Sequence, residues 1–159
     1  TGPLQGMKSL RRLHLVGTGI NSVEQLSSIP TLEELDLSGN KLTEVAALSR
    51  LKKLVTLRLS NNQLSKLDSF MSMGHLLEID LSNNMIEDIS PLGELESVEI
   101  INLNANRMTD IEPLMRLGAV ERISLRENPE LSCDALSSLV QLLGTDVVRY
   151  SEGCENYYK

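Results

Sequence analysis

Apolar residues recur along the chain with a period of 22 residues. The units begin at Leu10, Leu32, Leu54, Leu76, Val98 and Val120. Each unit reads L-x-x-L-x-L-x-x-N-x-L-x-x-L-x-x-L-x-x-L-x-x, and the apolar slots of the second are Leu32, Leu35, Leu37, Leu42, Val45, Leu48 and Leu51. Because the phase does not drift over six units, the repeat determines the fold more strongly than any local propensity.

The two halves of each unit predict different backbone conformations. In the first half apolar and polar residues alternate, as in Leu35-Asp36-Leu37, which is typical of a strand with one buried face. In the second half every third residue is apolar, which favours short 3₁₀ or extended turns over α-helix. One unit cannot bury its leucines alone, so we expect an α/β repeat solenoid with stacked parallel strands on one side.

The ninth slot of the unit is a column of amides. It holds Thr18, Asn40, Asn62, Asn84, Asn106 and Asn128. A buried amide both donates to and accepts from the backbone where the chain turns off a strand. We therefore interpret the column as structural and not as a ligand site.

Two further segments carry a family resemblance. Residues 86–92 read I-E-D-I-S-P-L and residues 108–114 read M-T-D-I-E-P-L. Together with the 22-residue phase, these segments resemble leucine-rich repeats of the bacterial internalin-like type, over residues 10 to about 143. The resemblance implies a right-handed superhelix with a concave parallel β-sheet, convex 3₁₀ or irregular turns and a short helical C-terminal cap. Members of that class are binding scaffolds, many displayed or secreted by bacteria and others cytosolic.

The resemblance is weaker at the two ends of the chain. We expect neither the helical N-terminal cap of internalins nor their immunoglobulin-like segment, so host-cell adhesion is not carried over. Leu4 and Met7 fall on the slots of Leu48 and Leu51, so residues 1–9 are interpreted as the remnant of a preceding repeat. An N-terminal end without a polar cap could pack against another domain or a second copy.

Residues 10–130 form the predicted array and residues 131–159 the predicted cap. Within the cap we expect a helix over about 133–143, ended by Gly144, and an edge strand over 147–150. Segments similar to its N-P-x-L-x-C motif close many exported bacterial repeat proteins.

Both cysteines, Cys133 and Cys154, lie in the cap. Their even number and position favour a disulfide, which would contribute roughly 3 kcal/mol through the unfolded chain. A bridge would place the protein in an oxidising compartment, at a bacterial surface or outside the cell. The alternative is a buried Cys133 and an unrelated, exposed Cys154 in a reducing cytoplasm.

Composition and charge remove several classes of partner. The net charge of −7 and the pI of about 4.9 argue against nucleic acid and against anionic membrane surfaces. No apolar run has the length of a membrane span. Aromatic residues make up only 3% of the chain, which counts against a carbohydrate-binding platform.

Catalytic chemistry is not expected. His75 is interpreted as a solvated turn residue, whereas His14 lies mid-strand beside the slot of Asp36. Ser124 is four strands from His14, too far for a nucleophile–base pair. A metal site from His14, Glu34 and Asp36 lacks the spacing of a known motif. We therefore expect no enzyme, cofactor or metal.

The concave face is the expected site of recognition. Val55, Leu77 and Ile100 have no interior role in the repeat and predict an exposed apolar strip rimmed by charge. Alternatively, the succession Asp36-Arg58-Asp80 is only a stabilising ladder of opposite charges. The candidate partner-binding residues are Arg12, His14, Glu34, Asp36, Val55, Arg58, Leu77, Asp80, Ile100 and Asn102.

The leading hypothesis is a protein-binding scaffold that recognises another protein through this concave face. The alternatives are a structural, self-assembling segment of a larger exported protein and a carbohydrate-binding accessory domain. The face lacks Trp and Tyr, the usual anchors of tight interfaces.

Overall fold

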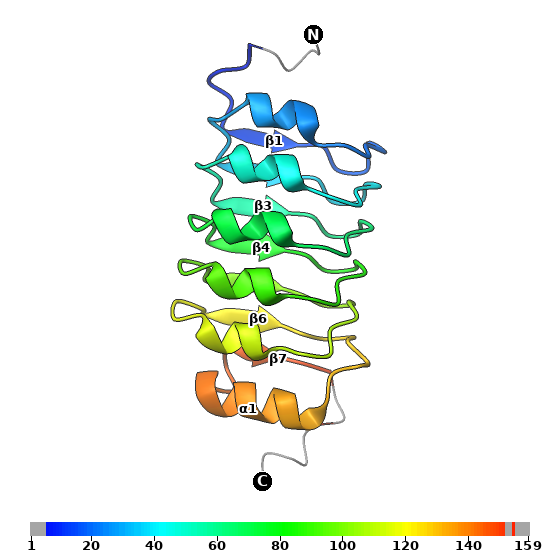
Figure 1. Cartoon of the computed structure of the whole chain (residues 1–159), viewed down its shortest axis with the longest axis vertical. Coiled ribbons are helices and arrows are strands. Elements are labelled where there is room, and N and C mark those ends of the chain that lie inside the picture. Colours follow the sequence, from blue (N-terminus) through cyan, green and yellow to red (C-terminus); the bar gives the residue numbers. More distant parts are fainter. Residues whose placement is uncertain (1–5, 152–153, 155–159) are drawn as a thin grey trace.

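The computed structural model describes residues 6–151 and residue 154. Seven short strands form one parallel sheet in chain order, stacked along the long axis of the molecule (Figure 1). The strands are β1 (Arg12–His14), β2 (Glu34–Asp36), β3 (Thr56–Arg58), β4 (Glu78–Asp80), β5 (Ile100–Asn102), β6 (Arg122–Ser124) and β7 (Val148–Arg149). Strands β1 to β6 pair residues of equal position in successive units.

Within the described residues, five 3₁₀ helices lie on the opposite side of the solenoid from the strands. They are η1 (Glu24–Ser28), η2 (Ala46–Arg50), η3 (Asp68–Ser72), η4 (Ser90–Glu94) and η5 (Glu112–Arg116). A 3₁₀ helix has three residues per turn, so apolar residues at every third position line up toward the core. The predicted solenoid, with its parallel sheet, 3₁₀ turns and helical cap, is confirmed.

A single hydrophobic core runs between the strands and the 3₁₀ helices. In every unit from the second on, the middle residue of the strand is buried, for example Leu35, Leu57 and Ile79. Phe70 occupies the slot that Leu48 fills one unit earlier and is also fully buried. Each layer covers its neighbours, so the repeats stabilise one another rather than folding singly.

The eighth slot of the unit has a left-handed backbone throughout the array. Its φ values are 64° at Gly17, 69° at Gly39, 56° at Asn61, 55° at Asn83, 52° at Ala105 and 57° at Glu127. This conformation turns the chain off the strand directly before the amide column. Glycine adopts it freely and asparagine with little penalty, whereas Ala105 and Glu127 adopt it at a cost of about 1 kcal/mol each.

The first unit is less covered than the others. Leu10, Leu13 and Leu15 are half-buried there, whereas the corresponding leucines of the second unit are fully buried. Met7, which the spacing placed in a core slot, is 44% exposed. Leu4 and the rest of residues 1–5 lie outside the described residues.

The cap begins with helix α1 (Cys133–Leu143), which has the predicted bounds and lies at the end of the stack (Figure 1). The Ser132 hydroxyl accepts a hydrogen bond from the Ala135 N–H at 3.2 Å, and Gly144 follows the helix with φ 98°. Strand β7 then pairs with β6. The predicted disulfide between Cys133 and Cys154 is present and ties the start of α1 to the chain beyond β7. The remaining cap residues, 152–153 and 155–159, lie outside the described ones.

Candidate binding face

Two columns of side chains point outward from the concave face of the sheet. The third slot of the units gives Arg12, Glu34, Thr56, Glu78, Ile100 and Arg122. The fifth slot gives His14, Asp36, Arg58, Asp80, Asn102 and Ser124, and β7 adds Arg149 beside Ser124. Because the strands are in register and about 4.8 Å apart, neighbours in each column are within reach of one another.

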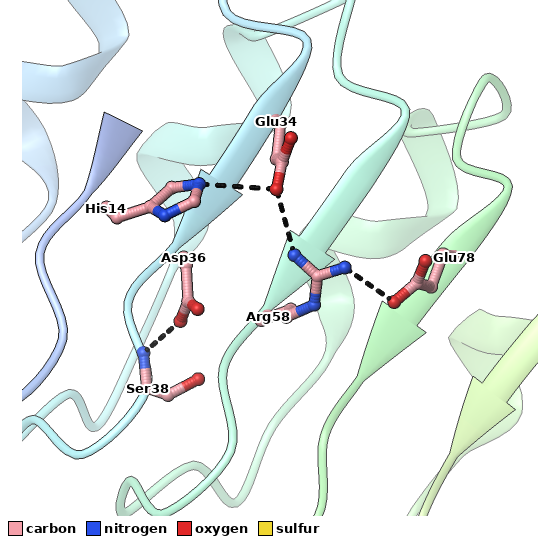
Figure 2. Close-up of polar contacts among 6 residues, drawn as sticks. All are labelled: His14, Glu34, Asp36, Ser38, Arg58 and Glu78. Atoms are coloured by element: carbon pink, nitrogen blue, oxygen red, sulfur yellow. Dashed lines mark hydrogen bonds and ion pairs between the residues drawn. The ribbon is translucent and has the colours of Figure 1, made fainter. Parts of the chain in front are cut away.

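Four of these side chains form a continuous polar network across β1 to β4 (Figure 2). The Arg58 guanidinium donates through Nη1 to Glu34 Oε1 at 3.0 Å and through Nη2 to Glu78 Oε1 at 2.9 Å. The same oxygen of Glu34 lies 3.2 Å from Nε2 of His14. The side chains of Arg58, Glu34 and Glu78 are 29–35% exposed, so the network is only partly screened by solvent.

The network changes the protonation behaviour of its members. The hydrogen bond from Arg58 is the main reason why the pKa of Glu34 is lowered, and the charges of His14 and Arg58 add to it. Partial burial works against the charge of Arg58, but its pKa is raised because Glu34 and Glu78 together outweigh that effect. Both groups are therefore held in their charged forms.

The predicted side-by-side placement of Asp36, Arg58 and Asp80 is confirmed, but these three side chains form no ion pair with one another. Arg58 pairs with the third-slot glutamates of its neighbours and not with Asp36 or Asp80, and His14 meets Glu34 in place of Asp36. The short side chain of Asp36 folds back and accepts the Ser38 N–H at 3.0 Å (Figure 2). Asp80 likewise accepts the N–H of Ser82 at 2.9 Å. Glutamate has one more methylene, so Glu34 and Glu78 can reach across to the arginine.

Glu78 belongs to this network but was not among the partner-binding residues predicted from the sequence. The signal that could have found it is side-chain length: an aspartate two residues before a serine at a strand end favours a local turn bond. The glutamates in the third slot are then the carboxylates left for Arg58.

The three aliphatic residues of the predicted strip lie in adjacent units. Val55 and Leu77 directly precede β3 and β4, and Ile100 begins β5. The Leu77 N–H donates to the Val55 carbonyl at 2.9 Å, and the Ile100 N–H donates to the Leu77 carbonyl at 3.0 Å. All three are half-buried, so the strip exposes less apolar area than the repeat pattern predicted.

The amides of the ninth slot lie beneath this face and make a ladder with the backbone. Asn62 donates to the carbonyls of Leu37 and Leu59, both at 3.0 Å, and accepts the Leu42 N–H at 3.0 Å. Asn40, Asn84, Asn106 and Asn128 donate in the same way, each to a carbonyl of its own unit and to one of the unit before. Thr18 replaces the amide in the exposed first unit and donates to the Leu15 carbonyl at 3.0 Å. The amide groups bond to the backbone throughout, and the Asn40 Oδ1 also accepts the Thr18 hydroxyl at 3.2 Å.

Neither a group of metal ligands nor a membrane-spanning helix is found among the described residues. Within residues 6–151 and 154, no three or more His, Cys, Asp or Glu side chains are grouped so that they could hold a metal ion. In the same part of the chain, no helix is long and apolar enough to cross a membrane.

These features define a class of protein, and comparison with known families agrees. The family described as "Leucine Rich repeats (2 copies)" matches residues 8–50, 30–70 and 74–116. The chain therefore belongs to the leucine-rich repeat family. No protein of the curated set matches the sequence.

Solved structures show the same fold. Internalin C2 from Listeria monocytogenes superposes with a TM-score of 0.81 at 24% identity, covering 93% of this chain and 74% of that one. A leucine-rich repeat protein of Leptospira interrogans superposes with a TM-score of 0.80 at 22% identity, over 93% of this chain and 39% of its own. Another Listeria internalin gives 0.63 at 18% identity, over 94% of this chain and 58% of its own. The chain is thus an internalin-like leucine-rich repeat solenoid that spans only part of each of these three proteins, and less than two thirds of two of them.

Proposed function

We propose that this chain is a non-catalytic scaffold that binds a partner protein through its concave face. Leucine-rich repeats commonly serve in protein interaction, and the observation that carries the proposal is the network of Arg58 with Glu34 and Glu78. It holds three long, charged side chains in fixed positions at the centre of a broad sheet. The proposed interface comprises Arg12, His14, Glu34, Asp36, Val55, Arg58, Leu77, Asp80, Ile100 and Asn102.

Rigid presentation is the proposed mechanism. A partner that meets side chains already held in place loses less conformational entropy on binding than one that must order them. Within the described residues, Glu34 and Glu78 each use only Oε1 toward Arg58, so their Oε2 atoms can accept hydrogen bonds from a partner. The half-buried Val55 and Leu77 beside them would supply a small apolar centre.

The disulfide supports a proposed location in an oxidising compartment. Structural disulfides persist outside the cell or in the periplasm and are rare in a reducing cytosol. The Cys133–Cys154 bridge closes the cap, so we propose that the protein acts at the bacterial surface or in the extracellular medium and not in the cytoplasm.

Self-association is a second candidate, favoured by the half-buried Leu10, Leu13 and Leu15 at the open side of β1. Two copies meeting there would cover these leucines and pair the free strand edge. Sedimentation velocity over a range of concentrations tests it, because a dimer must dissociate on dilution whereas a monomer keeps one sedimentation coefficient. A carbohydrate-binding role has no comparable observation in its favour.

Photo-crosslinking tests the leading proposal. A benzoylphenylalanine replaces Thr56, which lies between Glu34 and Glu78 on the face, or as a control Ser72, which is exposed on η3. We expect a saturable product of one mass from position 56, removed by excess unlabelled protein and weakened by Arg58→Ala. Equal products from both positions, or none from position 56 in extracts of the native source, would refute recognition through this face.

A further inference from the structure

Three arginines gather at the C-terminal end of the concave face. Arg122 begins β6, Arg126 follows that strand by two residues, and Arg149 ends β7. The register places Arg149 directly beside Ser124, which is two residues from Arg122 and two from Arg126. Their Cα atoms therefore lie within roughly 5–7 Å of that of Ser124. All three side chains are exposed, and we refer to them as the arginine cluster.

The three side chains project from the same side of the sheet. Ile123 and Val148, which pair with each other, are buried. Because successive side chains of a strand alternate between the two faces, Arg122 and Arg149 project to the concave side. Arg126 follows the buried Leu125 in the same alternation. Guanidinium groups from three adjacent positions can thus converge on one ligand.

The arginine cluster differs from Arg11 and Arg58 in forming no ion pair with a carboxylate of the described residues. Arg11 pairs with Glu33 at 3.5 Å, and Arg58 pairs with two glutamates. None of the ion pairs formed among residues 6–151 and 154 includes a member of the arginine cluster. Like charges side by side on neighbouring strands destabilise a sheet, so the fold itself gains nothing from this grouping.

The floor of the cluster is polar and already fixed. Oδ1 of Asn104 accepts from the Ser124 hydroxyl at 2.8 Å and from the Arg126 N–H at 2.7 Å. These bonds hold the backbone and the short side chains between the arginines. The groups that can contact a ligand here are the three guanidinium groups. Guanidinium groups bind carboxylates in bidentate geometry.

We propose that the arginine cluster binds an acidic segment of the partner protein, beside the acidic middle of the same face. The proposal rests on the proposed function and specifies the chemistry of the partner. The middle of the same face carries Glu34, Asp36, Glu78 and Asp80, with only Arg58 among them. A long polyanion such as nucleic acid or a sulfated polysaccharide would run from the cluster into these carboxylates and be repelled.

A protein surface can match both zones. Carboxylates of the partner would face the arginine cluster, and its hydrogen-bond donors or basic side chains would face the acidic middle. A partner whose carboxylates faced the acidic middle would be repelled, so the two zones together select the charge pattern of the partner.

The test is an NMR titration of the ¹⁵N-labelled chain with acetylated, amidated tetraglutamate at low salt, with tetralysine as the control of opposite charge. We expect the Nε–Hε signals of Arg122, Arg126 and Arg149 to shift with tetraglutamate but not with tetralysine. The triple variant R122Q/R126Q/R149Q should bind tetraglutamate about tenfold more weakly. The matched triple variant R50Q/R107Q/R116Q loses the same charge elsewhere and should change the affinity less than about twofold.

Two results would overturn the proposal. One is an equal loss of affinity in the two triple variants, or shifts centred on other basic residues, which would indicate non-specific attraction. The other is tighter binding of a sulfated heparin hexasaccharide than of tetraglutamate through the same three arginines, which would assign the site to glycans. Unchanged backbone amide signals away from the three positions in R122Q/R126Q/R149Q exclude misfolding as the cause of the loss.

The two proposals can fail separately. Crosslinking from position 56 without tetraglutamate binding at the cluster supports the scaffold function and contradicts the proposal that the partner supplies an acidic segment. Tetraglutamate binding at the cluster without face-specific crosslinking supports the anion site and contradicts the proposed protein partner.

Discussion

Removal of one amide from the ninth slot tests how the repeats are joined. Asn84 lies in the middle of the array and is 8% exposed. Its Nδ2 donates to the carbonyls of Leu59 and Leu81, both at 3.0 Å, and of Ser82 at 3.2 Å. Its Oδ1 accepts the Leu64 N–H at 3.0 Å. In Asn84→Ala all four bonds are lost.

The magnitude follows from what each backbone group retains. The carbonyls of Leu59 and Leu81 each keep one amide donor, because Asn62 and Asn106 also donate to them, and the Ser82 carbonyl keeps the Asn61 N–H. The Leu64 N–H keeps no acceptor among the described residues. An unsatisfied buried N–H costs about 2 kcal/mol and each of the three lost bonds to a shared carbonyl about 0.5 kcal/mol, so we expect a loss of about 3.5 kcal/mol.

Urea unfolding followed by far-UV circular dichroism measures the loss, and hydrogen exchange at Leu64 localises it. Asn83→Gly is the matched control, because Asn83 is exposed and has φ 55°, a conformation that glycine adopts freely. The control should change stability by less than about 0.5 kcal/mol. A loss below about 1 kcal/mol in Asn84→Ala at unchanged m-value, with Leu64 still protected, would refute the view that the ladder joins the units.

Three other outcomes can be measured. Ala105→Gly should raise the unfolding free energy by about 0.5–1 kcal/mol in thermal or urea unfolding, because residue 105 has φ 52°; a decrease would contradict strain at this slot. Carbon-detected NMR should find the pKa of Glu34 below its ordinary 4.5, and Arg58→Ala should bring it back up. Since the folded-state pKa is the lower one, this stabilisation is present above the ordinary value and is lost as the pH falls through the lowered one, and an unchanged pKa in Arg58→Ala would exclude the hydrogen bond as its cause. Replacing Cys133 and Cys154 together by serine should lower the unfolding free energy by about 3 kcal/mol, given a sequence separation of 21 residues, and unchanged stability would show that the bridge does not restrict the unfolded chain.

The structural features that recur in every 22-residue unit could be predicted from the sequence. Six units in one phase define the strand positions, the 3₁₀ segments and the amide column, because a leucine in a given slot meets the same environment in every layer. Helix α1 could also be predicted, since the leucines return to helical spacing after Ser132 and Gly144 offers a natural end. These inferences depend on periodicity and on backbone chemistry, which the sequence states directly.

The features that could not be predicted depend on the reach of individual side chains. The periodic pattern shows that Asp36 and Arg58 are neighbours, but it does not show that Asp36 bonds to Ser38 while Glu34 reaches the arginine. The half-burial of Val55 and Leu77 likewise depends on where the chain enters the strand rather than on the order of apolar residues. The arginine cluster was missed because Arg149 follows α1 and lies outside the 22-residue phase, so only the pairing of β7 with β6 brings it to Arg122 and Arg126.

The layered stack and its closed cap have a mechanical consequence. The layer at β1 has half-buried leucines, whereas the cap is closed by α1 and by a covalent bridge. Each unit is held mainly by its neighbours, so tension applied along the long axis would separate the layers one after another. Each 22-residue step would release about 70 Å of extended chain, and the segment enclosed by the bridge would stay closed to the last. A protein anchored by its cap would thus lengthen in discrete steps under load and not fail all at once.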